Sequence, residues 1–343
     1  MLPPQPTAPG QYLSVETSDA QLQAACLPGW TQDYMQLSCG QFVGRLIEVK
    51  LGPVQVYRET LNQATDERCQ GPDDRCTVGM TLSGRGGFLQ GRPMEEHSLW
   101  VLPANEFIRY RAPHDSDIVV ASLDTDALLR HARIVLGRDI APLLDDAPLR
   151  GLTSLTGTRF RRTLGSAIRA SASTPALLQH PAALRQLADD VLDACVLALG
   201  EAQHDNRLLR DRQHVHRAIV DRAREFILDR RGSAPTVTDL CEQLGMSRRG
   251  LHHAFVHVLD ISPVAYIRQL RLHEVRRMLV EDGVAVSTAA HAWGFWHLGI
   301  FSQYYKAMFG ELPSVTARTP GHARLRPLDP RTAGALADQL LLG

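Results

Sequence analysis

Two segments of this sequence carry side chains that suit the recognition of nucleic acid. In the first, Arg248 and Arg249 are followed by His252 and His253. An arginine guanidinium can donate two hydrogen bonds to O6 and N7 of guanine in the major groove of DNA. The same side chains also contact phosphates, which receive half or more of all protein–DNA hydrogen bonds. The pattern predicts contact with DNA and leaves base contact and phosphate contact both open.

The second segment, near residue 300, offers a different chemistry. The amide of Gln303 can pair with adenine, and the side chain of Ile300 can contact the methyl group of thymine. Gly299 would allow a close approach of the backbone, whereas His297 and Lys306 are better placed for phosphates. The neighbouring Trp296 either packs against the protein, which we favour, or contacts the DNA backbone. Together, the candidate DNA-binding residues are Arg248, Arg249, His252, His253, His297, Gly299, Ile300, Ser302, Gln303 and Lys306.

The histidines also permit a metal-binding interpretation, which the spacing disfavours. His252 and His253 are adjacent, so on a helix they point about 100° apart and do not share one ion easily. His253 and His257 are four residues apart and could share one, but the sequence near them supplies no third ligand. We therefore predict no metal here. A separate hypothesis is that histidine protonation makes DNA affinity depend on pH between 6 and 8.

The first segment has the signals of a helix–turn–helix unit. Thr236 can cap a helix with Asp239 at its third position, and Gly245 permits the left-handed turn that ends it. Ser247 then caps a second helix over residues 247–259. The second helix of such a unit is the one that lies in the major groove.

A second unit of the same kind follows at residues 285–309. Gly294 supplies its turn, and its recognition helix is predicted over residues 298–309, ended by Gly310 and Pro313. Between the two units, Pro263 starts a helix at the position where proline is favoured. A rigid connecting helix would fix the distance between the two recognition helices.

Residues 214–320 resemble the DNA-binding domain of the AraC/XylS family of bacterial transcription regulators. The resemblance rests on Leu244–Leu251, Ile261–Pro263, Trp293–Leu298 and Phe309–Ser314, in this order. The last two blocks are also similar to the subgroup that contains the ethanolamine-operon and anthranilate-dioxygenase regulators. The resemblance implies binding of a double-stranded DNA operator, activation through contact with RNA polymerase, and response to a small-molecule effector of unknown identity.

The N-terminal part has the pattern of a β domain. Short apolar runs with partial period-two alternation lie between Phe42 and Leu123 and are separated by glycine-rich turns. The predicted fold is a cupin-like jelly-roll β domain with trailing helices, followed by an all-α domain with two helix–turn–helix units. An effector would bind inside the barrel. Candidate pocket residues are Tyr57, Arg58, Trp100, Phe107 and Tyr110, although the pattern favours ordinary core or surface packing for each of them.

These patterns divide the chain into five parts. We predict a disordered N-terminus (1–15), a ligand-sensing and dimerisation domain (16–200), a linker (201–213), the DNA-binding domain (214–320) and a tail (321–343). Apolar residues recur at three- and four-residue spacing along residues 181–199. That stripe is either the seam of a homodimer, which the family resemblance favours, or a surface that packs on the barrel.

The net charge of zero, from 37 Lys and Arg against 37 Asp and Glu, is unevenly distributed. Residues 215–320 hold 13 basic against 10 acidic side chains, so the predicted DNA-binding part is mildly basic and residues 1–214 carry −4. A net of +3 predicts few phosphate contacts and a shallow salt dependence. No signal peptide or apolar span is evident, which predicts a cytoplasmic, nucleoid-associated protein.

Two rival functions are also compatible with the sequence. One is a repressor or architectural DNA binder without a ligand. The other is a DNA-repair enzyme fused to a regulator, which would need a zinc-bound cysteine cluster; Cys26, Cys39, Cys69 and Cys76 lack the close spacing expected. Cupin enzymes use a His-x-His pair, and the nearest candidate is residues 95–97 (Glu-Glu-His). We therefore predict no enzyme, no cofactor and no metal.

Overall fold

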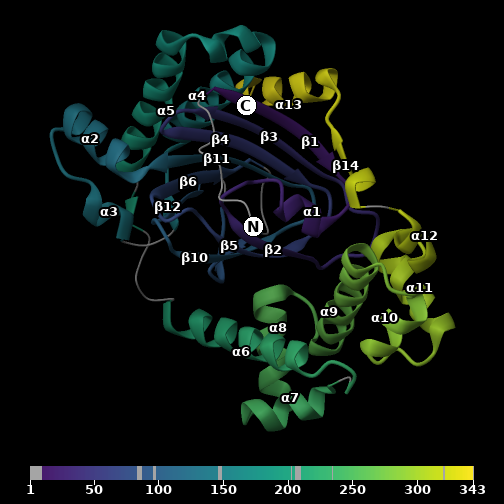
Figure 1. Ribbon diagram of the computed structural model, residues 1–343. Helices are drawn as coiled ribbons and strands as arrows, with labels where there is room; N and C mark the ends of the chain where they lie inside the picture. Colours follow the sequence, from purple (N-terminus) through teal and green to yellow (C-terminus); the bar gives the residue numbers. More distant parts are fainter. Residues whose placement is uncertain are drawn as a thin grey trace.

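The computed structural model describes residues 10–82, 87–95, 98–145, 149–201, 203–204, 210–233, 235–319 and 321–342. Figure 1 shows a β-rich domain covered by helices, with a second, all-helical domain against its open side. The predicted two-domain fold is confirmed: two antiparallel sheets precede the helix–turn–helix units. Residues 96 and 97 of the Glu-Glu-His motif lie outside the described residues.

Two sheets form the β domain. In spatial order, the larger sheet contains β13 (Gln203–His204), β12 (Leu149–Gly151), β9 (Ser98–Leu102), β6 (Arg75–Thr81), β11 (Ser116–Asp124), β4 (Val54–Leu61), β3 (Gly44–Leu51), β1 (Gln11–Thr17) and β14 (Leu325–Pro327). The smaller sheet contains β2 (Thr31–Gln36), β5 (Thr65–Gln70), β10 (Phe107–Ala112), β7 (Phe88–Leu89) and β8 (Arg92–Pro93). The short helix α1 (Ala20–Ala24) joins β1 to β2.

The larger sheet is buried on both faces, which explains why its strands show only partial alternation. On β4, Tyr57 belongs to the core between the two sheets, whereas Val54 and Val56 face the helices. The covering helices and turns are α2 (Thr125–Leu136), α3 (Ala141–Asp145), α4 (Ser154–Ser173), η1 (Pro175–Gln179), α5 (Pro181–Glu201) and α13 (Pro330–Leu342). Successive side chains of a strand point to opposite faces of the sheet, so they enter two different apolar cores: one between the sheets and one under the helices.

The apolar stripe of residues 181–199 packs within the subunit. Val191, Cys195 and Leu199 are fully buried in the core under the larger sheet, where α5 contacts α2 and α4. The prediction that this stripe is a dimer seam is therefore wrong for its apolar side chains. They pack on the larger sheet of the same subunit, as the alternative interpretation predicts. Apolar spacing along a helix shows which face is buried, but it does not show whether the same subunit or a partner covers that face.

Both ends of the described chain belong to the β domain. Residues 11–15, predicted to be disordered, lie in β1, which pairs along its length with β3; residues 1–9 lie outside the described residues. The predicted tail returns to the same domain, because β14 pairs with β1 and α13 packs on α4. Figure 1 shows α13 beside α4, far along the sequence from it.

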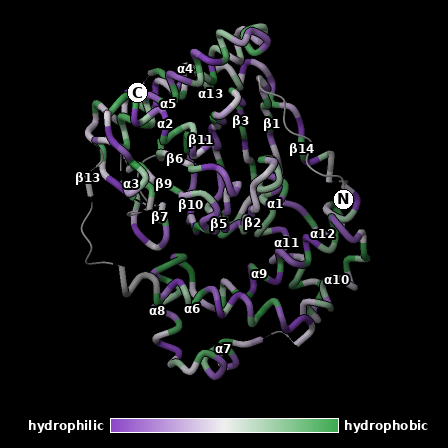
Figure 2. The backbone as a smooth tube through the Cα atoms, turned by 60° about the vertical axis from the view of Figure 1, so that its left-hand side comes forward, coloured by the Kyte–Doolittle hydropathy of each residue, from purple (hydrophilic) through white to green (hydrophobic). Residues whose placement is uncertain are grey.

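The second domain consists of helices only in its described residues. These are α6 (Arg210–Asp229), α7 (Val237–Leu244), α8 (Arg248–Leu259), α9 (Pro263–Arg277), the π-helical turn η3 (Met278–Asp282), α10 (Val286–Ala292), α11 (Leu298–Phe309) and α12 (Pro313–Arg318), with the turn η4 (Gly321–Arg324) leading back to β14. Figure 2 shows hydrophobic and hydrophilic residues interleaved along both domains. Accordingly, no described helix is long and apolar enough to cross a bilayer.

Gly79 on β6 faces Trp100 on β9, and its lack of a side chain makes room for the indole. A Cβ built on Gly79 would lie 2.1 Å from Cζ2 of Trp100. We expect Gly79→Ala to lower the free energy of unfolding by roughly 1–3 kcal/mol, because overpacking a core displaces side chains. Urea denaturation measures this, with Gly334→Ala as control, because a Cβ there meets nothing within 4 Å. Equal stability of both variants would contradict the expectation.

Candidate nucleic-acid interface

The first helix–turn–helix unit is built as the sequence predicts. The Thr236 hydroxyl accepts a hydrogen bond from Asp239 N, and the Asp239 carboxylate accepts one from Thr236 N at 2.7 Å, forming a capping box. Gly245 ends α7 with a φ of +63°. The Ser247 hydroxyl then accepts a hydrogen bond from Gly250 N and caps α8. These local bonds satisfy the free backbone groups at both helix ends.

The buried back of α8 leaves its polar face free for recognition. Leu251, Phe255 and Val258 are buried against α6 and α9. The remaining face is exposed and carries the predicted DNA-binding residues of this unit, which are Arg248, Arg249, His252 and His253. One face of α8 is therefore fixed in the core, and the opposite face exposes the arginine and histidine side chains.

The second unit repeats this arrangement with an aromatic core. Gly294 turns the chain with a φ of +72°, and the Phe295 ring packs on that of Phe301 at 5.1 Å. Phe301 and Tyr305 bury the back of α11. Of the predicted residues, His297, Gly299, Ile300, Gln303 and Lys306 are exposed, and the half-buried Ser302 donates its hydroxyl to Leu298 O.

Helix α9 contributes to the cores of both units. Tyr266 and Leu270 belong to the core of the first unit, whereas Leu272 and Val275 belong to that of the second. Because one continuous helix contributes to both cores, the two recognition helices keep a fixed separation. The predicted connecting helix is confirmed over Pro263–Arg277, and its rigidity stays a prediction.

Sequence reasoning missed basic and aromatic side chains between the two units. The Arg268 guanidinium lies 4.7 Å from the ring centre of Tyr304, and both residues line a groove that also contains Arg248. Trp296 borders this groove and is 65% exposed, and its ring stacks on that of His291 at 5.4 Å, so the expected packing takes place at the surface of the protein. The available signal was the arginine pair 268 and 271 on the connecting helix, one turn apart.

His253 has a packing partner that the sequence did not suggest. His216 on α6 places its ring 5.0 Å from that of His253 and 5.1 Å from that of His257. Burial, together with these two neighbours, lowers the pKa of His216. Within the part of the chain that the structure describes, no group of three His, Cys, Asp or Glu side chains is arranged to hold a metal ion.

The five predicted pocket residues separate into two groups. Tyr57, Trp100 and Tyr110 line one small cavity between the two sheets. Arg58 lies on the opposite face of β4, where it pairs with Asp117 and donates to Leu336 O of α13. The Phe107 side chain is 41% exposed outside the cavity. The fixed alternation of β4 places residues 57 and 58 on opposite sides of the sheet.

Three arginines of the helical domain bind carboxylates of the β domain. Arg217 pairs with Asp66 at 2.7 Å, Arg224 with Asp33 at 2.5 Å, and Arg276 with Asp19 at 2.5 Å. These side chains are therefore used for docking, and the basic charge available to DNA is smaller than the sequence count suggests.

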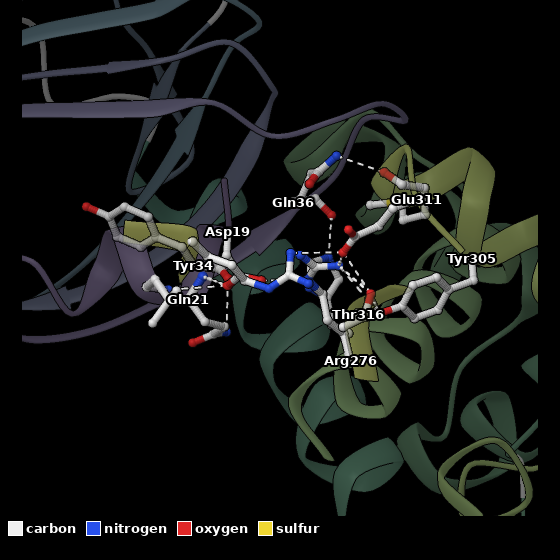
Figure 3. A network of polar contacts seen from close by, with 12 residues as sticks. Asp19, Gln21, Tyr34, Gln36, Arg276, Tyr305, Glu311 and Thr316 are labelled. Atoms are coloured by element: carbon white, nitrogen blue, oxygen red, sulfur yellow. Dashed lines mark hydrogen bonds and ion pairs between the residues drawn. The ribbon is translucent and has the colours of Figure 1, made fainter. Parts of the chain in front are cut away.

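Figure 3 shows Arg276 at the centre of one such network. Its Nε donates to Asp19, which also caps α1, while its Nη1 donates to Glu311 at 2.8 Å. Burial alone would raise the pKa of Asp19, but Arg276 outweighs burial and holds that pKa below its usual range. The network joins α1 of the β domain to α9 and to the segment after α11.

The loop after β2 contacts the end of the second recognition helix. Met308 O, near the end of α11, accepts hydrogen bonds from Gln36 Nε2 at 3.0 Å and from Gly40 N at 3.1 Å. On α9, Gln269 Nε2 donates to Leu37 O at 2.7 Å. Carbonyls at the end of a helix lack partners within the helix, so the β domain supplies them here.

Comparison with known proteins agrees with this geometry. A model described as a helix-turn-helix domain matches residues 240–319, which include both recognition helices. The chain is 26% identical over 215 residues to the probable thc operon regulatory protein of Rhodococcus erythropolis, covering 61% of this chain and 64% of that protein. It is 33% identical over 113 residues to the XylDLEGF operon transcriptional activator 3 of Pseudomonas putida, covering 32% and 33% of the two chains. Over its helix–turn–helix units the chain is therefore similar to bacterial operon regulators, which agrees with the resemblance of residues 214–320 to the AraC/XylS family.

A solved structure also aligns with this chain. The AraC-like transcriptional activator CuxR covers 78% of this chain and 96% of its own length, at 14% identity and a TM-score of 0.43. The chain matches less than two thirds of the length of each of the two relatives above. The resemblance to the ethanolamine-operon and anthranilate-dioxygenase subgroup stays a prediction.

Proposed function

We propose that this chain is a transcription regulator of the AraC family that acts by sequence-specific binding of double-stranded DNA. The observation that carries the proposal is that α8 and α11 are both buried on one face, exposed on the other, and joined through a single helix, α9. Two helices held in this way can enter successive segments of the major groove on one side of the duplex, about one helical turn apart.

The two exposed faces differ in chemistry, and so would their roles. Arg249 and His252 on α8 would read base edges, with arginine on guanine as the strongest pairing. Gln303 and Ile300 on α11 would contact adenine and a thymine methyl, while Lys306 would neutralise a phosphate. Arg268, from the groove between the units, adds a cation that sequence reasoning did not include.

Substitution of Arg249 and Lys306 separates base contact from phosphate contact. Arg249→Ala is expected to weaken binding by about 1–3 kcal/mol and to relax the preference at one base pair. Lys306→Ala is expected to weaken binding to all sequences alike and to lower the slope of log K against log salt by about one. Fluorescence anisotropy measures both effects, using a duplex obtained by in vitro selection and a scrambled duplex.

Arg318→Ala is the matched control, because this exposed arginine lies on α12, outside both recognition helices. It should leave specificity and the salt slope close to those of the unmodified chain. Equal losses on both duplexes for Arg249→Ala would reject base reading by that residue. Failure of in vitro selection to enrich any sequence would reject the proposed function itself.

We further propose that the regulator acts mainly as an activator and responds to a small molecule held in the β domain. The relative from Pseudomonas putida is named a transcriptional activator, which supports this sign of regulation. The docking contacts from β2 and α1 to α9 and α11 offer a physical route between the two domains. Run-off transcription with bacterial RNA polymerase tests the sign: a lower yield with the regulator present would make it a repressor.

A further inference from the structure

The groove between the two helix–turn–helix units borders both recognition helices and has a volume of about 570 Å³. Arg248 lines it from the first turn of α8, and His297 and Ile300 line it from the start of α11. Helix α9, which joins the two units, contributes Arg268 and Arg271. The groove therefore adjoins both surfaces that would enter the major groove, so a partner assigned to it rests on the proposed function.

The lining of this groove is positively charged. Arg248, Arg268 and Arg271 belong to it, and no Asp or Glu is found among its described residues. None of these three arginines forms an ion pair with a described carboxylate, whereas the arginines that dock the helical domain on the β domain each pair with one. Cations without a partner beside an open groove favour an anionic partner there.

Apolar side chains are also exposed along this groove. Trp296, Val264 and Ile300 are each at least half exposed, and all three belong to the lining. Exposed apolar surface that gathers in one groove is typical of a surface that a partner covers. A nucleic-acid strand offers phosphates for the arginines and the apolar faces of its sugars for the flat side chains.

The position of the groove indicates which part of a duplex would face it. Two recognition helices in successive segments of the major groove leave the intervening minor groove opposite the surface between them. A minor groove lies between two rows of phosphates, and it is narrow and strongly negative along a run of A·T pairs. Such a minor groove attracts arginine side chains.

We propose that this groove binds the intervening minor groove of the operator and selects A·T pairs there through Arg268. Its guanidinium lies 4.7 Å from the ring centre of Tyr304, whereas Arg271 donates to Trp293 O and Arg248 belongs to a recognition helix. The contact with the ring restricts the Arg268 side chain in advance, so less conformational entropy is lost when it binds DNA. Arg268 would thus give specificity at base pairs that neither recognition helix contacts.

Fluorescence anisotropy on the full chain tests this proposal with three duplexes. They share the two major-groove segments obtained by in vitro selection, and the spacer between these segments consists of A·T, G·C or inosine·cytosine pairs. Inosine·cytosine keeps the major-groove edge of G·C and lacks its amino group in the minor groove, so only contact in the minor groove makes it resemble A·T. We expect the A·T and inosine duplexes to bind at least about fivefold more tightly than the G·C duplex.

Two surface variants assign this preference to Arg268. Arg268→Gln removes the cation and should weaken binding of the A·T and inosine duplexes by about fivefold, so that all three spacers bind alike. Tyr304→Leu keeps the cation but removes the ring beside it, and should reduce the preference in part. Arg231→Gln is the matched control, because this exposed arginine also lies over a ring, that of Trp293 at 5.7 Å, and is outside the groove lining.

Three outcomes would overturn the proposal. They are equal binding of the three duplexes by the unmodified chain, an inosine duplex that binds like the G·C duplex, and an equal loss on all three spacers for Arg268→Gln. The last result would make Arg268 a phosphate contact only. In each case the selected segments are still bound, so the proposed function stands. If selection enriches no sequence, the proposed function and this inference both fail.

Discussion

Replacing Arg276 by methionine is expected to lower the free energy of unfolding by about 3–5 kcal/mol, because it leaves a buried carboxylate without its cation. Asp19 is 5% exposed, and its Oδ2 lies 2.5 Å from Nε of Arg276. The same guanidinium lies over the ring of Phe309 at 4.7 Å and donates to Glu311. Arg324 also pairs with Glu311, so Asp19 is the acid that loses most.

Urea denaturation followed by tryptophan fluorescence measures this loss. Arg277→Met is the matched control. The Arg277 guanidinium, next to Arg276 in sequence, is 38% exposed and pairs with Glu274 and Glu281 on the same helical segment. Exposed pairs of this kind contribute about 1 kcal/mol or less. The double variant Asp19→Asn with Arg276→Met should recover part of the loss, which a double-mutant cycle would show as a positive coupling.

The same variant tests whether docking regulates DNA binding. If the pair between Asp19 and Arg276 holds the helical domain in place, Arg276→Met should change DNA affinity, whereas Arg277→Met should not. Equal stability and equal DNA affinity of the two methionine variants would show that this network only fills space between the domains. Neither residue lies among the predicted DNA-binding side chains, so the affinity readout reports on docking.

The second large effect is the response of stability to pH at Glu59. Burial raises the pKa of Glu59 to about 7 from its ordinary value near 4.5. A raised pKa in the folded state stabilises the protein fully below pH 4.5, and this contribution is lost as the pH rises through 7. The difference corresponds to about 3 kcal/mol lost between pH 4.5 and 8. Glu59→Gln, which stays neutral, should therefore lose less stability over that range.

The groups that face Glu59 set the conditions of this measurement. Tyr34 on β2, Tyr57 on β4, and Glu67 and Cys69 on β5 all lie around the cavity. The pKa of Glu67 is raised by burial and then by Glu59, so the unmodified chain loses stability through both acids as the pH rises.

The pKa of the buried Asp66 is shifted in the opposite direction. In Asp66, burial would raise the pKa, but the arginines around it, Arg217 first, lower it below its usual value. Stability from Asp66 is therefore complete above pH 4 and is lost only in stronger acid. Chemical denaturation at pH 5, 6.5 and 8 would show parallel profiles for Glu59→Gln and the unmodified chain if the raised pKa were wrong.

The local elements of the helical domain could be predicted from the sequence because their signals are local. Capping by Thr236 and Ser247 involves hydrogen bonds that span three residues, and Gly245 adopts a left-handed conformation that other residues rarely reach. The start and end of α8 and α11 followed from such signals to within one residue. The exposed face of each helix followed from its apolar periodicity.

The ion-pair partners of the arginines could not be predicted from such local signals. The sequence places Arg276 on a helix in a basic domain, and only the tertiary structure places it against Asp19, 257 residues earlier. Likewise, Arg58 and Tyr57 are neighbours in sequence, but Arg58 pairs with Asp117 of β11 on the face of the sheet that the helices cover, whereas Tyr57 lines the cavity between the sheets. Alternation separates the two faces of a strand without stating which face is inside.

The sequence by itself determined where the two recognition helices lie and which residues they expose, because backbone caps, glycine turns and helical periodicity are properties of short segments. Only the tertiary structure decided that the apolar stripe of α5 covers the larger sheet and that the C-terminal tail adds a strand to the same sheet. It also decided that Glu59 and Glu67 meet between the two sheets. These features depend on contacts between segments far apart in the chain. Their free energy comes from burial and charge pairing in the assembled fold, for which local spacing carries no signal.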